Sequence, residues 1–248
     1  MKKPEQPLVP HRYLATTTHA VMQGQHVWRV ANALAKREQF TPDIIIGHPG
    51  WGDMLFLKDL FPHAKILSFF EFYYRATGAD VGFGEPVTDD DLARVRVKNI
   101  TNILSLEAAD WGISPTVWQW SIHPPEFRSK ISVLHDGVDV ARCVPDAAAE
   151  VTLPNGKTFR AGDEVMTYVA RNFEPYRGFP TFMKAAEILL RERPNLHIIA
   201  IGADDVSYGR KAPDGLTYRQ MWSKQVTLDE SRIHFVGTVP YNDLIKLF

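Results

Sequence analysis

Two arginines, Arg171 and Arg177, form the most informative chemical pattern in the sequence. The run 165–170 is typical of a buried strand and delivers Arg171 to its carboxyl end, while Arg177 precedes Gly178 and a helical pattern. Ligands of open α/β sheets bind at the carboxyl ends of strands. Guanidinium groups donate paired hydrogen bonds to phosphate oxygens, and a helix start offers free N–H groups. The pattern predicts a diphosphate site, although it equally fits two solvated arginines, one of them paired with Glu174.

Other residue types point to a sugar or to ordinary packing. The segment 69–74 is dense in aromatic residues, and the carboxylate of Glu71 within it needs a partner or a perturbed pKa. Tryptophans stack on sugar rings but pack more often in cores and interfaces, a choice that the sequence leaves open for Trp51, Trp111, Trp118 and Trp120. The histidines share no metal-binding spacing, and no metal site is predicted.

Charge and composition exclude several classes of protein. The 28 lysines and arginines nearly balance the 29 acidic residues, and the net charge of −1 argues against non-specific nucleic-acid binding. A single cysteine, Cys143, excludes an intrachain disulfide and fits a reducing compartment. No apolar run approaches the roughly 20 residues of a membrane span, and no signal peptide opens the chain. We therefore expect a cytoplasmic protein.

The first half of the chain reads as alternating helices and strands. Residues 1–12 suggest a loose arm. The residues 25–38 have one apolar helical face formed by Val27, Val30, Ala31, Leu34 and Ala35. Further helices are expected over 54–60, from 89 to about 107, and after Ser114. Buried strands are expected at 44–46 and 65–70, and a further short strand at 131–134.

The second half is more regular. The turn 154–156 predicts a hairpin between 151–153 and 157–159. Strands are expected at 165–170, 196–201 and 233–236, with helices from 179 to 190 and from 241. Strands that alternate with helices through short loops imply parallel sheets, and we place the domain boundary near 137–140.

Three segments resemble one known family. The segment 169–202, which begins V-A-R-N-F-E-P-Y-R-G, resembles the opening of the donor-binding domain of family-4 (group 1) retaining glycosyltransferases, which have the GT-B fold. V-L-H-D-G-V-D at 133–139 resembles the inter-domain segment of that family, and R-I-H-F-V-G-T-V-P at 232–240 its strand before the base pocket. The resemblance is weaker over 41–74, which fits the acceptor-side domain.

The resemblance implies a role for each candidate residue. Arg171, Arg177 and Gly178 would hold the diphosphate of a nucleotide sugar and stabilise the leaving group, without a metal or cofactor. Gly202 would permit close approach to the donor, and Gly237 with Thr238 would meet its base. The acceptor-side cleft would be lined by His48, Gly50, Trp51, Gly52 and Glu71. Many relatives have a histidine near the position aligned with Glu71.

Some parts of the family pattern are not present. We find neither the first strand with its glycine-containing loop nor the later pair of glutamates eight positions apart that would hold the ribose and the sugar. We therefore expect two Rossmann-like α/β lobes of GT-B type, both incomplete. Residues 1–137 would be an acceptor-side lobe lacking its first strands, and 138–248 a donor-binding lobe lacking its last part.

The resulting hypothesis is a hexosyltransferase. It would move a hexose from a nucleoside-diphosphate sugar to a glycan or lipid-linked acceptor with retention, and no residue is assigned as catalytic. The alternative is a non-catalytic nucleotide-sugar binding module, or a degenerate subunit that needs a partner chain to supply the missing segments. The sequence does not decide whether the protein contacts a membrane surface. Many relatives act on lipid carriers, but the sequence contains no basic amphipathic helix that would indicate such contact. A different Rossmann-type nucleotide enzyme is disfavoured, since no G-x-G-x-x-G motif is present.

Overall fold

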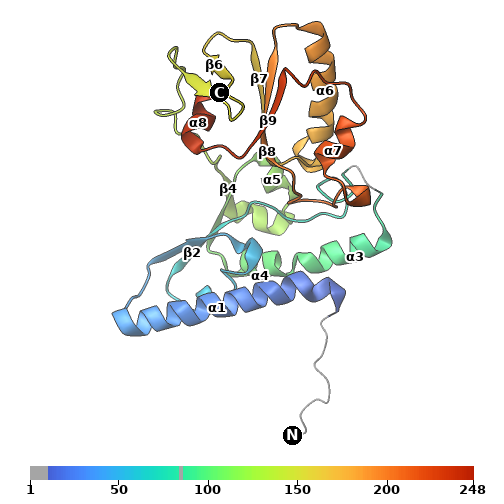
Figure 1. Ribbon diagram of the computed structural model, residues 1–248. Coiled ribbons are helices and arrows are strands. Elements are labelled where there is room, and N and C mark those ends of the chain that lie inside the picture. The colour runs from blue at the N-terminus through green and yellow to red at the C-terminus, as the bar shows by residue number, and fades with distance from the viewer. Residues whose placement is uncertain (1–10, 84–85) are drawn as a thin grey trace. The chain divides into compact units, whose positions relative to one another are not determined.

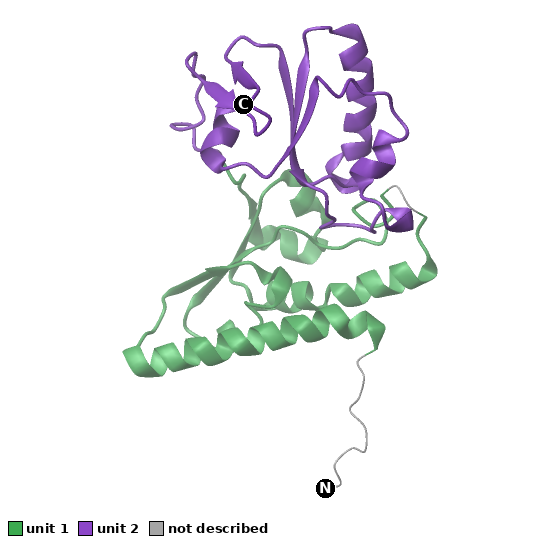
Figure 2. Cartoon of the chain, viewed as in Figure 1, with its two compact units in different colours: residues 1–137 green, residues 138–248 purple. Residues whose placement is uncertain are grey.

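The structure is a computed structural model that describes residues 11–83 and 86–248 (Figure 1). The arm expected over residues 1–12 therefore lies outside the described residues, except for its last two. Contacts divide the chain into two compact units, unit 1 with residues 1–137 and unit 2 with residues 138–248 (Figure 2).

Unit 1 contains a parallel sheet of four strands in the order β1-β2-β3-β4. Helices connect the strands, as the alternating sequence pattern predicted. The elements in chain order are α1 (Ala15–Glu38), β1 (Ile44–Gly47), α2 (Leu57–Leu60), β2 (Lys65–Phe69), α3 (Asp89–Lys98), α4 (Ile100–Ala108), β3 (Trp111–Ser114), α5 (Val117–Ile122) and β4 (Ile131–Val133).

One face of this sheet carries the core of unit 1. Ile66 of β2 and Ile131 of β4 are buried there together with Leu106 of α4. Helix α1 contributes Val27 and Ala31, which pack against this cluster as its apolar spacing predicted. Val30, which the same spacing assigned to the buried face, is instead 56% exposed.

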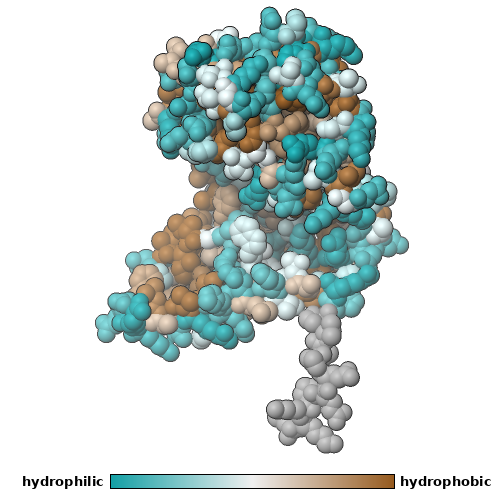
Figure 3. Space-filling view, viewed as in Figure 1, coloured by the Kyte–Doolittle hydropathy of each residue, from teal (hydrophilic) through white to brown (hydrophobic). Residues whose placement is uncertain are grey.

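The prediction of a buried strand at 44–46 was wrong for two of its three residues. Ile44 is 53% and Ile46 66% exposed, because β1 is the edge strand and only the face with Ile45 meets the core. Trp111 shares the exposed face through the register of β1, β2 and β3. Figure 3 shows hydrophobic residues gathered over the sheet of unit 1.

Three helix boundaries differ from the prediction, two of them where a side chain bonds to the backbone. The single helix expected from 89 to 107 is divided at Asn99, whose amide bonds both the N–H and the C=O of Tyr74. The helix expected after Ser114 begins at Val117, because the Thr116 hydroxyl caps it by accepting from the N–H of Gln119. The helix expected from 54 begins only at Leu57.

Unit 2 contains a parallel sheet of three strands in the order β7-β8-β9 and a separate antiparallel hairpin. The α/β class with parallel sheets in both halves is thus confirmed. The elements are β5 (Glu150–Thr152), β6 (Thr158–Arg160), β7 (Val165–Asn172), α6 (Phe179–Glu192), β8 (His197–Ala203), α7 (Tyr218–Ser223), β9 (Ile233–Gly237) and α8 (Tyr241–Lys246).

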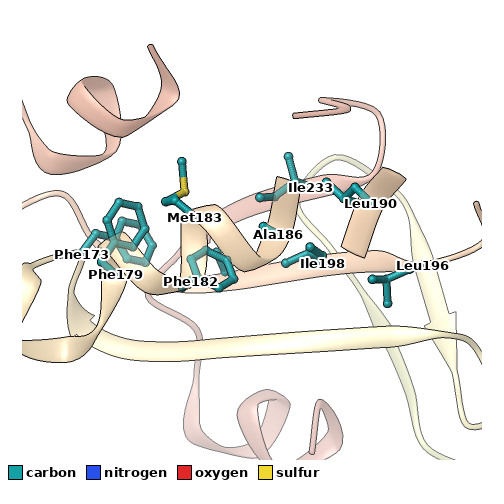
Figure 4. Close-up of a cluster of buried hydrophobic side chains, with 10 residues drawn as sticks. Phe173, Phe179, Phe182, Met183, Ala186, Leu190, Leu196, Ile198 and Ile233 are labelled. Atoms are coloured by element: carbon teal, nitrogen blue, oxygen red, sulfur yellow. The ribbon is translucent and has the colours of Figure 1, made fainter. Parts of the chain in front are cut away.

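Helix α6 covers one face of this sheet and supplies five of the ten buried residues in the larger hydrophobic cluster of unit 2. The helix expected from 179 is confirmed, and Phe179, Met183 and Ala186 on it are fully buried (Figure 4). The rings of Phe173 and Phe179 stack with their centroids 4.9 Å apart. This packing fixes the start of α6 against the end of β7, which is where the predicted diphosphate residues stand.

Candidate functional site

The donor-side candidates gather at the carboxyl edge of the sheet in unit 2. Arg171 is an exposed residue of β7, and its side chain has no hydrogen bond or ion pair within the described residues. A 3-10 turn, Pro175–Arg177, follows, and Gly178 has φ of +76°, a left-handed conformation that favours glycine. The chain then enters α6. Strand, loop and helix thus have the predicted order.

Arg177 is held on several sides although its guanidinium reaches solvent. Its side chain is 43% exposed, and its Nε lies 3.7 Å from Oε1 of Glu174. The guanidinium carbon lies 5.3 Å from the ring centre of Tyr208. The Tyr168 hydroxyl donates to the carbonyl of Arg177 at 3.0 Å, and burial, aided by the charge of Glu174, raises the pKa of Tyr168 to about 12. Tyr168 therefore stays a hydrogen-bond donor at neutral pH.

The start of α6 offers fewer free N–H groups than the sequence suggested. Gly178 N–H donates to the carbonyl of Pro175 at 2.9 Å, and Phe179 N–H to that of Glu174 at 3.4 Å. Pro180 has no N–H at all. An anion at this loop would consequently depend on the two guanidinium groups more than on the helix backbone.

The ends of β8 and β9 differ in the room that they leave. A Cβ at Gly202 would lie 2.6 Å from the carbonyl oxygen of Ala170 and 2.9 Å from the ring of Phe173. Gly202 is therefore needed for close packing of β7 on β8, a reason independent of any donor. Gly237 has φ of +71° and no atom within 4 Å of such a Cβ, and Thr238 beside it is exposed. The end of β9 is thus open to a ligand.

The acceptor-side candidates gather at the carboxyl edge of the sheet in unit 1. His48 follows β1 and Glu71 follows β2, and their side chains meet with His48 Nε2 3.1 Å from Glu71 Oε2. The N–H of Gly50 donates to Nδ1 of His48 at 3.0 Å. This assigns the tautomer of a neutral ring, in which Nε2 carries the proton and donates to Glu71. The partner that Glu71 was expected to need is therefore His48.

Trp51 extends this group with an exposed aromatic surface. It is 61% exposed, and its ring lies 4.4 Å from that of His48. The neighbouring glycines have structural reasons. A Cβ at Gly50 would lie 2.7 Å from the His48 ring, and one at Gly52 would lie 2.1 Å from the carbonyl oxygen of Ala20 in α1. The glycines are thus required by the fold of the loop, whereas the side chains of His48, Trp51 and Glu71 lie together at this edge of the sheet.

Sequence spacing did not indicate that Ser207 and Tyr208, in the segment after β8, would join the donor-side group. Ser207 and Tyr208 donate their N–H groups to Oε2 of Glu174 at 2.6 and 3.1 Å. Nearby, Asp204 pairs with Arg219 at 2.6 Å. Glu174 itself stood in the sequence only as a partner for an arginine, and nothing in the spacing indicated that it would be fully buried.

Within 11–83 and 86–248, no three or more His, Cys, Asp and Glu side chains are grouped so as to hold a metal ion. Among the helices of the same ranges, none combines the length and apolar character that a membrane crossing requires.

Comparison with known families gives a match over more than half of the chain. The family described as glycosyl transferase family 4 group matches residues 2–143. No curated protein matches the chain significantly.

Comparison with solved structures gives distant matches. A Listeria monocytogenes structure assigned as a UDP-N-acetylglucosamine 2-epimerase is 14% identical, with 91% of this chain and 53% of that chain covered and a TM-score of 0.46. The MnaA co-structure with UDP from S. aureus is 15% identical, with 98% and 56% covered and a TM-score of 0.44. The UDP-GlcNAc 2-epimerase of Neisseria meningitidis bound to UDP-GlcNAc is 10% identical, with 96% and 59% covered and a TM-score of 0.40. The chain spans little more than half the length of these structures.

Proposed function

The chain belongs to the glycosyl transferase family 4 group, and from that premise we propose that it transfers a hexose from a nucleoside-diphosphate sugar to a glycan or lipid-linked acceptor. We infer retention at the anomeric carbon from the family resemblance of residues 169–202, and polysaccharide biosynthesis as the setting. Unit 2 would bind the donor and unit 1 the acceptor.

The observation that carries the proposal is the loop between β7 and α6. Arg171 has no partner within the described residues, and Arg177 leaves its terminal nitrogens unbonded there. Transfer breaks the bond between the anomeric carbon and the diphosphate, and negative charge grows on the leaving oxygen. Two guanidinium groups would stabilise that charge by paired hydrogen bonds. The open end of β9 at Gly237 and Thr238 would receive the base.

The acceptor side of the proposal rests on the group in unit 1. Exposed Trp51 would stack on a sugar ring, since aromatic faces pack well on the apolar face of a sugar. The Glu71 carboxylate, half exposed, would accept a hydrogen bond from an acceptor hydroxyl while His48 holds it in place. Glu71→Gln should then raise the KM for the acceptor and leave nucleotide affinity unchanged.

A thermal-shift titration with uridine and guanosine diphosphates tests the donor site. We expect one of them to stabilise the chain, and the stabilisation to be smaller in each of the single variants Arg171→Ala and Arg177→Ala. The control is Arg191→Ala, because Arg191 is an exposed arginine at the far end of α6 that pairs, among the described residues, with Glu192 alone. Unchanged stabilisation in both variants would contradict the site.

A radiolabelled transfer assay separates catalysis from mere binding. Turnover by the chain would exclude the alternative of a non-catalytic nucleotide-sugar module. Donor binding without transfer, restored by addition of a partner chain, would support the degenerate subunit instead.

A further inference from the structure

Glu174 is a charged residue in an unusual place, the loop between β7 and α6. Its side chain is fully buried. Burial of a carboxylate is costly unless hydrogen bonds and a counter-charge compensate. Oε2 has such bonds, because it accepts from the N–H groups of Ser207 and Tyr208 at 2.6 and 3.1 Å.

The other oxygen of Glu174 faces the donor-side arginine. Oε1 is buried and accepts no hydrogen bond from any described residue. The cation beside it is the guanidinium of Arg177, with Nε at 3.7 Å, longer than a hydrogen bond. The carboxylate therefore attracts Arg177 without occupying the terminal nitrogens that a phosphate would use.

The segment after β8 provides a second link between Glu174 and Arg177. Glu174 accepts a hydrogen bond from the backbone N–H of Tyr208, and the guanidinium carbon of Arg177 lies 5.3 Å from the ring centre of Tyr208. Such cation–π contacts favour one orientation of the guanidinium. The Asn172 amide contacts the Ser207 hydroxyl at 2.5 Å, which ties the same segment to β7 at a neighbouring point.

We propose that Glu174 is a positioning residue for Arg177, which it orients through its own charge and through the Tyr208 ring. The inference rests on the proposed function, in which Arg177 binds the donor diphosphate. Glu174 itself touches no substrate in this arrangement. If Glu174 acted only by its charge, its removal would strengthen the binding of an anion. The positioning role predicts the opposite result, that neutralising Glu174 weakens diphosphate binding.

The test is a double-mutant cycle with calorimetric titration of uridine and guanosine diphosphates into the full chain. Glu174→Gln keeps the side-chain shape, and we expect it to weaken binding about tenfold. In an Arg177→Ala background, the same substitution should have no further effect. Tyr208→Ala removes an exposed side chain and leaves the core intact. It too should weaken diphosphate binding in the unaltered chain and have no further effect in the Arg177→Ala background. The matched control is Glu187→Gln, since Glu187 on α6 also accepts a backbone N–H, that of Thr227, at 2.7 Å.

Each alternative gives a different result. If Glu174 were merely structural, Glu174→Gln would weaken diphosphate binding equally with and without Arg177. If Glu174 repelled the diphosphate, Glu174→Gln would strengthen binding. Either result overturns the inference. Amide exchange at Ser207 and Tyr208, which needs no nucleotide, should become faster in Glu174→Gln but not in Glu187→Gln. If the unaltered chain binds neither diphosphate, the proposed function fails first, and the role of Arg177 fails with it.

Discussion

The substitution Gly202→Ala tests whether the glycine at the end of β8 serves packing. Its φ of +154° disfavours any side chain, which costs about 1–3 kcal/mol. The added Cβ would also lie 2.6 Å from a carbonyl oxygen of β7 and 2.9 Å from the ring of Phe173. Because backbone cannot move aside as a flexible side chain does, overpacking adds about 1–3 kcal/mol. We expect unit 2 to lose about 2–6 kcal/mol of unfolding free energy.

Gly237→Ala is the matched control, because its φ of +71° imposes backbone strain while its Cβ would meet no atom within 4 Å. The unfolding free energy of both variants is measured by chemical denaturation, and amide exchange in β8 provides a second, local measurement. Gly202→Ala should cost at least about 1 kcal/mol more than Gly237→Ala. Equal losses, or a Gly202→Ala chain of full stability that no longer binds nucleotide, would refute the packing explanation and favour a direct contact with the donor.

Two further predictions concern stability. Burial, and to a smaller extent neighbouring positive charge, lowers the pKa of both His197 and His234. Below about pH 6.5 the unfolded chain therefore binds more protons at these two imidazoles than the native chain does. Unfolding free energy of unit 2 should therefore fall with falling pH, by at most about 1.4 kcal/mol per pH unit for each imidazole, and His197→Gln with His234→Gln should flatten a denaturation series between pH 7 and 5; a wild-type profile that is already flat would contradict this. Asp110 accepts from Lys58 Nζ and from the N–H of Ile66, both at 2.9 Å, so Asp110→Ala should destabilise unit 1 by about 1–3 kcal/mol in urea denaturation, whereas the exposed Asp59→Ala should change it by less than about 0.5 kcal/mol.

The sequence predicted the elements whose periodicity is dense and locally consistent. Helix α6 and strand β8 combine a clear apolar period with short loops, and both appear within two residues of their predicted bounds. Residues 15–24 of α1 were missed because threonines are weak helix formers. Their helix depends on tertiary packing, which the Gly24 backbone makes possible by its close approach to Phe56.

Short or irregular elements were also missed. Strand β3 has only four residues, W-G-I-S, with neither alternation nor a continuous apolar run. Helix α7 did carry a signal, since Thr217 and Gln220 form a capping box that its sequence spacing permits.

The positions of candidate residues at strand ends could be predicted from the sequence, whereas their contacts with one another could not. Strand ends place Arg171 and His48 at ligand-binding edges from sequence order alone. The hydrogen bond of His48 to Glu71 depends on β1 and β2 being neighbours in register, and that of Glu174 to Tyr208 on a loop with no regular pattern. Such contacts join residues far apart in the chain, so local spacing carries no record of them.

The most direct test of the central claim is the ³¹P NMR spectrum of a nucleoside diphosphate in the presence of the chain. We predict that uridine or guanosine diphosphate shows shifted and broadened phosphate signals with the unaltered chain, and free-ligand signals with the Arg171→Ala/Arg177→Ala double variant. Phosphate signals that the unaltered chain leaves unperturbed, or perturbs as strongly after both arginines are removed, would contradict a diphosphate site between β7 and α6.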